Sequence, residues 1–383
     1  MVGRHTLRDR ARADHGVFWW SRHRFCALLV AGPFAQTGTE VYLMQKQWRL
    51  AARPDGVPDR SHFDLVEVPI PELEPGKAVV KTLYLGVAPV MLRYMRNETE
   101  FESPMALGTV MPGRGVAQVI ASDCEGLPAG AIVQARVGWQ EYALIDTSDR
   151  PAPFLLPRDL PLSHGIGAVS LSGITALVGI RDIGLVKPAD HILVSGAAGG
   201  VGSHVAEIAK ALGARQVVGI AGGPEKCRRL ATDMGYDHVI DYKNDDMDSA
   251  LDTAFPEGVD LYFDNVGGPL LDNVLGRLRR RARIVICGSI SEYLVAQENK
   301  HRFINLQNLG RQDAKMEGFF VFDYESIYPE CIDTLAKWVR DGALNPVEDI
   351  SQGIETMPDA LADLYLGNNI GVRMVHVAEP DQV

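Results

Sequence analysis

The stretch that decides the fold is Ser195-Gly-Ala-Ala-Gly-Gly-Val-Gly202, a run of small residues. The apolar segment just before the run, residues 192–195, has the length and composition of a buried strand. After it, apolar side chains recur on one face of a helix: Val201, Val205, Ile208 and Leu212. Small residues let the backbone approach a pyrophosphate, and a helix start offers it free N–H groups. The spacing Ala197-x-Gly199-x-x-Gly202 therefore predicts a dinucleotide-binding turn.

Strand and helix patterns continue to alternate around and after this turn. Short apolar strands are predicted at residues 192–195, 216–220, 259–263 and 283–287. Apolar residues at helical spacing lie between strands, as in Cys227, Leu230, Ala231 and Met234, and a further helix is predicted at residues 326–340. Repeated β-α units of this length predict an α/β fold with a doubly wound, parallel Rossmann sheet.

The part of the chain that precedes these units is rich in β structure. Strands with many β-branched residues are predicted at 65–70, 78–84, 115–120 and 131–137. Clusters of turn-forming residues separate them, for example Pro75-Gly76 and Pro128-Ala-Gly130. A strand-like segment, residues 372–377, occurs much later. Short strands with this punctuation predict a small barrel-like domain.

Composition and charge exclude several classes of protein. The 383 residues suffice for two domains, and with 46% apolar residues each can bury a core. A formal net charge of −11 opposes binding to nucleic acids and anionic lipids, so we expect no nucleic-acid or membrane partner. The longest apolar run, residues 25–32, is far shorter than the ~20 residues of a membrane span. The five cysteines include no C-x-x-C pair, which argues against disulfides or structural zinc and favours a cytoplasmic localisation.

The first 43 residues differ in charge from the rest. Their basic residues are Arg4, Arg8, Arg10, Arg12, Arg22 and Arg24, and their only acids are Asp9, Asp14 and Glu40. Basic residues before an apolar segment are also typical of a signal or transit peptide. We expect instead an extension outside the fold, with the folded protein beginning at Met44, because a secreted protein would lack its nucleotide.

The residues after the second strand indicate which nucleotide binds. In NAD sites a carboxylate about 20 residues past the glycine turn binds the ribose. Here Ala221-Gly-Gly223 stands at that place, and Lys226 follows at the start of the next predicted helix. A missing acid and an added cation fit a 2′-phosphate, so we predict NADPH/NADP+ as the cofactor. We interpret Arg228 and Arg229 as a solvated helix face.

Five further segments occur in order: Gly222-Gly-Pro-Glu-Lys-Cys227, Ile240-Asp-Tyr-Lys243, Tyr262-Phe-Asp-Asn-Val-Gly-Gly268, Cys287-Gly-Ser-Ile-Ser-Glu-Tyr293 and Met316-Glu-Gly-Phe319. With them, residues 44–378 resemble the zinc-independent medium-chain dehydrogenases/reductases. The resemblance is to their branch of prostaglandin reductases and NADP-dependent alkenal (enone, curcumin-type) reductases. It implies an NADP-dependent oxidoreductase that reduces the C=C bond of α,β-unsaturated carbonyls, such as alkenals and enones, and that forms a homodimer.

The resemblance also implies a division of the chain and a set of contacts. Residues 44–165 and 324–383 would form a GroES-like β-barrel substrate domain completed by the C-terminal segment, and residues 166–323 the NADP-binding Rossmann domain. The implied cofactor contacts are Gly199, Gly200, Val201, Gly202, Lys226, Tyr242, Asn265, Cys287, Gly288, Ser289, Ile290, Ser291, Phe319, Phe320, Val321 and Asn369. For Asn265 an Asx turn is the alternative interpretation.

Three positions depart from the pattern of this branch. Its Asp-Pro-Tyr-Met-Arg is replaced by Ala88-Pro-Val-Met-Leu92, so that Val90 stands in place of a pocket tyrosine. Its Gly-Leu-Thr-Ala-Tyr becomes Gly173-Ile-Thr-Ala-Leu177, and a lysine near the C-terminal end becomes Val372. The cofactor half follows the pattern more closely than the substrate half.

Reduction of a conjugated double bond needs a hydrogen-bond donor for the carbonyl oxygen, where the negative charge of an enolate develops. We predict Tyr293 for this catalytic role; simple packing against the cofactor is the alternative. No metal is expected, because Met111-Pro-Gly-Arg-Gly115 stands where zinc-dependent relatives carry Gly-His-Glu. Trp139 and Phe319 are either apolar walls of the substrate site or core residues.

Three other functions stay open at this stage. A quinone reductase would share the fold and need no metal. A non-catalytic NADPH-binding protein is kept open by Val90 and Leu177, which alter the substrate half. Oxidation of a hydroxyl group, as in the relatives that handle eicosanoids, is a weaker alternative.

Overall fold

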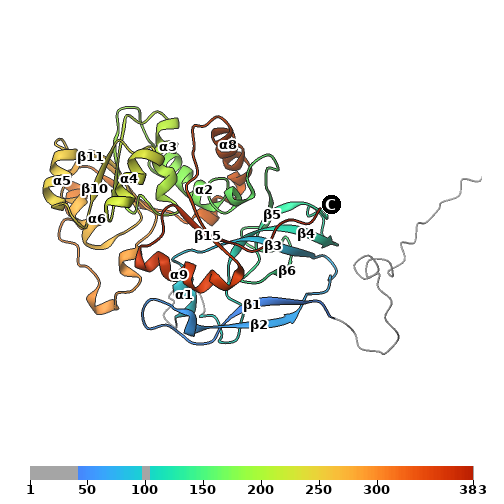
Figure 1. Cartoon of the computed structure of the whole chain (residues 1–383). Helices are drawn as coiled ribbons and strands as arrows, with labels where there is room; N and C mark the ends of the chain where they lie inside the picture. Colours follow the sequence, from blue (N-terminus) through green and yellow to red (C-terminus); the bar gives the residue numbers. More distant parts are fainter. Residues whose placement is uncertain (1–41, 97–103, 383) are drawn as a thin grey trace, which may run out of the picture. The chain divides into compact units, whose positions relative to one another are not determined.

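The structure is a computed structural model that describes residues 42–96 and 104–382. Apart from residues 42 and 43, the extension predicted at residues 1–43 lies outside this described part. Leu43–Val383 forms one compact unit. It contains a parallel sheet with helices and a second, mixed sheet, so the α/β fold is confirmed (Figure 1). No helix in the described ranges is long and apolar enough to cross a membrane.

One part of this unit is built on a parallel sheet of six strands. The strands are β8 (His191–Val194), β9 (Gln216–Ala221), β10 (His238–Asp241), β11 (Val259–Asp264), β12 (Leu278–Ile286) and β13 (Lys315–Gly318). Their order in space is β10-β9-β8-β11-β12-β13, and all neighbours are parallel. This is the 3-2-1-4-5-6 order of a Rossmann sheet, which confirms the doubly wound topology predicted from the sequence.

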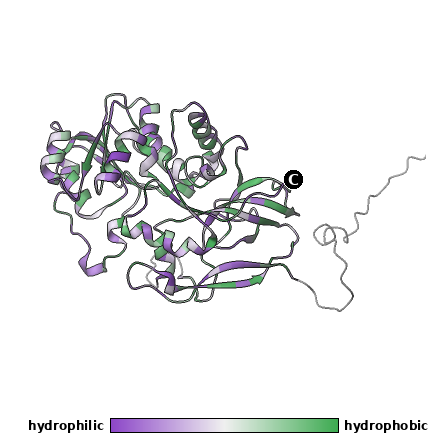
Figure 2. Cartoon of the chain, in the orientation of Figure 1, coloured by the Kyte–Doolittle hydropathy of each residue, from purple (hydrophilic) through white to green (hydrophobic). Residues whose placement is uncertain are grey.

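Helices cover this sheet on both faces because its strands are apolar on both sides. In β8, Ile192 and Val194 join one buried core, and Leu193 between them joins another. In Figure 2 the strands are largely coloured as hydrophobic, whereas the helices alternate between both colours. The helices are α2 (Leu171–Val178), α3 (Gly202–Ala211), α4 (Pro224–Asp233), α5 (Met247–Ala254), α6 (Gly268–Leu275) and α8 (Tyr328–Arg340). Buried residues of α2, α3 and α8 belong to the first core, and those of α5 and α6 to the second.

The second sheet is mixed and combines early with late parts of the chain. Its order is β14-β15-β3-β4-β5-β7, and β6 also pairs with β3. The strands are β3 (Ala78–Gly86), β4 (Arg114–Ser122), β5 (Ile132–Arg136), β6 (Tyr142–Ile145), β7 (Phe154–Leu155), β14 (Glu348–Gln352) and β15 (Val372–His376). A separate antiparallel pair consists of β1 (Met44–Leu50) and β2 (Phe63–Pro69). Because β15 lies between β14 and β3, the C-terminal segment completes the sheet that the early strands begin.

Some elements differ from the sequence prediction for local reasons. The helix predicted at 326–340 is preceded by a 3-10 segment, Val321–Ile327, and its α-helical part starts at Tyr328, where Pro329 suits the first turn. β12 begins at Leu278 rather than residue 283, since its arginines hide the apolar pattern of a strand. The short helices α1 (Met91–Met95) and α9 (Met357–Leu366) were not predicted. α8 packs in the same core as α2, and the domain division proposed at residue 323 stays a prediction.

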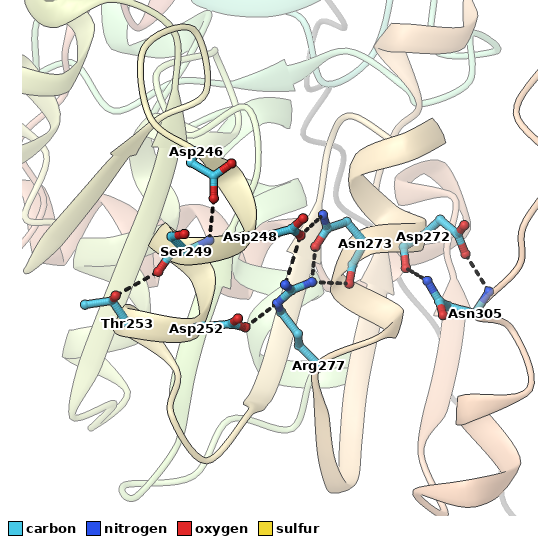
Figure 3. A network of polar contacts seen from close by, with 9 residues as sticks. All are labelled: Asp246, Asp248, Ser249, Asp252, Thr253, Asp272, Asn273, Arg277 and Asn305. Carbon is cyan, nitrogen blue, oxygen red and sulfur yellow. Dashed lines mark hydrogen bonds and ion pairs between the residues drawn. The ribbon is translucent and has the colours of Figure 1, made fainter.

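A network of polar side chains joins α5 to α6 (Figure 3). The Arg277 guanidinium donates to the carboxylates of Asp252 at 2.7 Å and Asp248 at 2.9 Å. In α6, the buried carboxylate of Asp272 accepts the N–H of Asn305 at 2.9 Å. The segment that leads into α7 (Asn308–Arg311) is thereby held against α6, beside the sheet that carries the candidate site.

Candidate cofactor and active site

The predicted site residues follow the carboxyl ends of the six parallel strands. Residues 199–202 follow β8, Lys226 follows β9, Tyr242 follows β10, Asn265 follows β11, residues 287–293 follow β12 and residues 319–321 follow β13. Parallel strands end at the same edge of a sheet, and doubly wound proteins bind ligands there, at the switch point that β8 and β11 form here. The fold thus brings to one edge residues that lie far apart in the sequence.

The turn after β8 is tight because its residues are small. A side chain at Gly202 would place its Cβ 2.3 Å from the carbonyl oxygen of Gly196, so the turn cannot close over a larger residue. Gly196 has a φ of +56°, which favours glycine. A Cβ at Gly200 would lie 3.8 Å from its nearest neighbour, Ser172 Oγ, an ordinary van der Waals distance. A tight turn of small residues, followed by the start of α3, fits a dinucleotide pyrophosphate.

Asp264, at the end of β11, organises this edge although sequence reasoning did not single it out. Its fully buried carboxylate accepts the hydroxyl groups of Ser195 and Tyr262, each at 2.7 Å. It also accepts the N–H groups of Val266 and Gly267, at 3.0 and 3.1 Å. One side chain therefore ties the end of β8 to the loop after β11. The sequence did contain a signal for Asp264: a carboxylate at the end of a predicted strand, directly followed by turn-forming residues.

Asn265 and the segment after β12 lie side by side. The Asn265 side-chain amide donates to the carbonyl oxygen of Ser195 at 2.7 Å, so it bridges two strand ends rather than closing an Asx turn. The N–H of Ile290 donates to the carbonyl oxygen of Asn265 at 3.3 Å. The hydroxyl of Ser291 donates to the carbonyl oxygen of Val266 at 2.6 Å. Cys287, which begins this segment, keeps its proton because burial raises the pKa of its thiol to about 12.

Lys226 and Tyr242 lie at the ends of neighbouring strands, with a second lysine close by. Burial lowers the pKa of the Lys226 ammonium, and the charge of Lys243 lowers it further, whereas the carboxylate of Asp349 raises it in part. The ring of Tyr242 covers Gly222, where a Cβ would lie 2.6 Å from the ring. Two ammonium groups that repel each other beside an exposed aromatic ring fit an anion such as a 2′-phosphate. Sequence reasoning included Lys226 and Tyr242 but missed Lys243, which follows the exposed tyrosine directly.

The C-terminal segment returns to this edge, as the resemblance implied. The N–H of Gly371 donates to the carbonyl oxygen of Ala198, in the glycine turn, at 2.8 Å. Asn369 is buried beside it, and its side-chain amide donates to the carbonyl oxygen of Gly371 at 3.2 Å. A Cβ at Gly367 would lie 4.0 Å from Lys226 Nζ. Residues after α9 therefore approach both the glycine turn and the lysine.

Tyr293 ends the segment after β12 and is half-buried. Burial raises the pKa of its phenol, and the charge of Arg93 lowers it in part, so the hydroxyl stays protonated at neutral pH. Its carbonyl oxygen accepts a hydrogen bond from the Arg96 guanidinium at 2.9 Å. A protonated phenol next to positive charge is a suitable donor to an oxygen that becomes negative.

The remaining predicted residues occupy different environments. Phe319 packs edge-on against Tyr324, whereas Phe320 is 57% exposed and packs against Phe322. Trp139 is fully buried in the core beside the mixed sheet, so it is a core residue and not a wall of the site. Leu177 is also fully buried, in α2, and its departure from the branch pattern affects a core rather than an exposed site.

The part of the chain that the structure describes contains no group of three or more His, Cys, Asp or Glu side chains that could hold a metal ion. Its cysteines, Cys124, Cys227, Cys287 and Cys331, are all free thiols.

Comparisons with known proteins agree with this geometry. Residues 46–151 match the N-terminal domain of oxidoreductase, and residues 200–337 match the family described as zinc-binding dehydrogenase. The YfmJ protein of Bacillus subtilis (strain 168) is 40% identical over 88% of this chain and 98% of its own length. The NADP(+)-dependent 2-alkenal reductase of Nicotiana tabacum is 37% identical over 84% of this chain and 94% of its own length.

A solved structure is similar over the same range. The complex of CurA from Vibrio vulnificus with NADPH is 35% identical, has a TM-score of 0.81, and covers 88% of this chain and 100% of its own. Identity and coverage of this extent, together with the Rossmann sheet, show a common family. The chain belongs to the medium-chain dehydrogenase/reductase family, in the branch of NADP-dependent alkenal, curcumin and prostaglandin reductases.

Proposed function

We propose that this chain is an NADPH-dependent reductase of the C=C bond in α,β-unsaturated carbonyls, chiefly alkenals and enones. The observation that carries the proposal is that the glycine turn, Lys226 and the segment ending in Tyr293 each follow the carboxyl end of a strand of the same parallel sheet. The tobacco relative, named a 2-alkenal reductase, supports this substrate class. The CurA complex, which contains NADPH, supports the cofactor.

The cofactor contacts that we propose follow the edge from one strand end to the next. Gly199, Gly200, Val201 and Gly202 hold the pyrophosphate, and Lys226, Tyr242 and Lys243 bind the 2′-phosphate. Asn265, residues 287–291, residues 319–321 and Asn369 border the ribose and nicotinamide. The small residues of the glycine turn and the mutual repulsion of the two lysines support these assignments.

The chemistry assigned to the protein is the stabilisation of charge and the delivery of a proton. Bound NADPH supplies the hydride that reduces the β-carbon of the substrate. The Tyr293 hydroxyl donates a hydrogen bond to the carbonyl oxygen and so stabilises the negative charge of the enolate. The same phenol or water then returns a proton to the α-carbon. The raised pKa of Tyr293 supports this role, because a phenolate could neither donate nor protonate.

We propose that this chemistry needs no metal. Hydrogen bonds can polarise the carbonyl, and residues 111–115 contain only Met, Pro, Gly and Arg, which are not zinc ligands. Dialysis against a chelator should then leave turnover unchanged. Loss of turnover that only zinc restores would refute a metal-free mechanism.

We also propose that the protein is a cytoplasmic homodimer. The edge strand β13 pairs on one side with β12 and on the other with none of the described strands, which leaves it free to pair with a second copy. The free thiols fit a reducing compartment. Light scattering coupled to size exclusion would measure the mass directly, and a monomer at assay concentration would contradict the dimer.

The test of the proposed reaction is an NADPH oxidation assay with three arms. The purified chain is mixed with NADPH and an alkyl enone, a simple quinone, or no acceptor, and the loss of nicotinamide absorbance is followed. Enone turnover with a saturated ketone as product is expected. Turnover with the quinone alone would make the chain a quinone reductase. NADPH binding without turnover of either would make it a binding protein.

A further inference from the structure

A second tyrosine, Tyr365, contacts the segment just before α1. It is half-buried near the end of α9, and its hydroxyl donates to the carbonyl oxygen of Pro89. The pKa of its phenol is raised, first by burial and then by the charge that Tyr293 would carry if ionised. Tyr365 and Tyr293 belong to different parts of the chain, since α7, α8 and β14 lie between them in the sequence.

Tyr365 adds a side-chain contact to the start of α1. Val90 is the N-cap residue, and within the described residues no side chain of this helix start caps it. The N–H of Leu92, in the first turn, donates to the carbonyl oxygen of Pro89 at 3.3 Å, and the Tyr365 hydroxyl donates to the same oxygen. The phenol thus binds the carbonyl group at which α1 begins.

The opposite end of α1 is tied to Tyr293. The Arg96 guanidinium, directly after this helix, donates to the Tyr293 carbonyl oxygen at 2.9 Å. A helix of a single turn is not stable by itself, so its position depends on such contacts. α1 therefore acts as a short rigid link, with Tyr365 at its start and Tyr293 at its end.

We propose that Tyr365 is a positioning residue for Tyr293, acting through the contacts that α1 makes at both ends. It reaches Pro89, the residue before Val90, from α9. The inference rests on the proposed role of Tyr293 and adds to it: the orientation of this phenol is set by a residue that need not touch the substrate.

The test is a double-mutant cycle of Tyr365→Phe and Tyr293→Phe, measured as kcat with an alkyl enone. Tyr365→Phe keeps the ring and removes the hydroxyl, and loss of one orienting hydrogen bond should lower kcat about three- to tenfold. In the Tyr293→Phe background the same change should have no further effect, because the group that it orients is gone. KM for NADPH should stay unchanged. Tyr142→Phe, in β6, is the matched control.

A second readout uses the protein without cofactor or substrate. 3-Fluorotyrosine is placed at position 293, and its ¹⁹F resonance is recorded in the unchanged chain, in Tyr365→Phe and in Arg96→Met. Both variants should shift or broaden this resonance, and Tyr142→Phe should not. Thermal unfolding of each variant identifies any that fail to fold, and Arg96→Met breaks the other end of α1 without altering α9.

The outcomes separate this inference from the proposed function. If Tyr365→Phe lowers kcat equally in both backgrounds and leaves the ¹⁹F resonance unmoved, Tyr365 does not act through Tyr293 and the inference is wrong. If Tyr293→Phe itself leaves kcat unchanged, the catalytic role of Tyr293 fails. In that case, a resonance that still moves in Tyr365→Phe would retain the structural link between the two tyrosines.

Discussion

A phenol that donates to a developing enolate acts only while it holds its proton. Burial raises the pKa of Tyr293, so its phenol is neutral at neutral pH. The informative substitution is therefore one that removes the hydroxyl group. We expect Tyr293→Phe to lower kcat for enones by about a hundredfold, as loss of one donor to an oxyanion does in other enzymes. The dissociation constant of NADPH, measured by calorimetry, should change less than twofold by comparison. An unchanged kcat would show that Tyr293 only packs against the cofactor.

We propose that Lys226 and Lys243, after β9 and β10, determine the choice between the two nicotinamide nucleotides. We expect Lys226→Ala to weaken NADPH binding about tenfold or more, since a charge-assisted contact to phosphate is lost, and to leave NADH binding unchanged. Lys243→Ala should act in the same direction. Lys210→Ala, which removes a lysine already paired with Asp237 at 2.7 Å, serves as the control in the same titrations. Equal weakening of both nucleotides would show that Lys226 does not read the phosphate.

At the scale of elements, α3 contains a histidine that the proposed reaction does not use. His204 has no solvent exposure, and burial lowers its pKa to about 4 from an ordinary 6.5. In the described part of the chain neither of its ring nitrogens has a hydrogen-bond partner. A histidine of this kind is neutral in the folded state at a pH where the unfolded chain already binds a proton.

The sign of the resulting pH dependence follows from this difference. Above pH 6.5 both states are neutral and His204 has no effect; as the pH falls toward 4, only the unfolded state gains the proton, and stability is lost. The loss attributable to His204 is about 2 kcal/mol at pH 5. His204→Leu should therefore lose less stability than the unchanged chain between pH 7.5 and pH 5 in urea unfolding. Parallel curves for both proteins would contradict the assignment.

Two further titratable groups, His164 and Glu348, also make stability depend on pH. Comparing His204→Leu with the unchanged chain removes their effect. Burial also lowers the pKa of His164, which adds a loss of the same sign. Glu348, whose carboxylate lies 4.0 Å from His164, has a raised pKa through burial and acts in the opposite direction. Both groups remain in His204→Leu, so they contribute to both curves.

Elements with a strong local pattern could be predicted, and elements defined by their partners could not. β8 and α3 are apolar at the spacing of a strand and a helix, and their turn has a recognisable glycine pattern. α1 has a single turn, and the Tyr365 hydroxyl from α9 binds the carbonyl oxygen of Pro89 just before it, a contact that no local window contains. The same reason explains why Asp264 was missed: its donors, Ser195 and Tyr262, come from two different strands.

For the whole molecule, the cofactor should stabilise both sheets together. Gly371, which leads into β15 of the mixed sheet, donates to Ala198 in the glycine turn of the parallel sheet. A ligand bound at this edge therefore lies at the junction between the two sheets rather than on one sheet alone. At 100 times its dissociation constant, NADPH should add about 2.7 kcal/mol to the free energy of unfolding. Calorimetry should show one transition that moves upward as a unit; a second transition that ignores NADPH would indicate separate halves.

The overall topology was accessible from sequence because β-α alternation admits few arrangements, and the Rossmann order is the commonest. Residues at the glycine turn and Lys226 could be placed because their neighbours along the chain define them. The surroundings of Tyr293 could not, since the Arg96 guanidinium that binds its carbonyl oxygen comes from a distant segment of the chain. Within its own segment, Val90 indicates only that the tyrosine of the branch pattern is absent.

The bond from Gly371 to the glycine turn has a consequence for synthesis of the protein. Ala198 leaves the ribosome long before Gly371 is translated, so a nascent chain can form β8 and α3 while its nucleotide edge is still open. A premature stop codon between the end of α8 and Asn369 would keep all six strands of the parallel sheet and yet remove β15 and the buried Asn369 that complete this edge. Truncated products of that kind are expected to fold in part and to compete for chaperones rather than for NADPH.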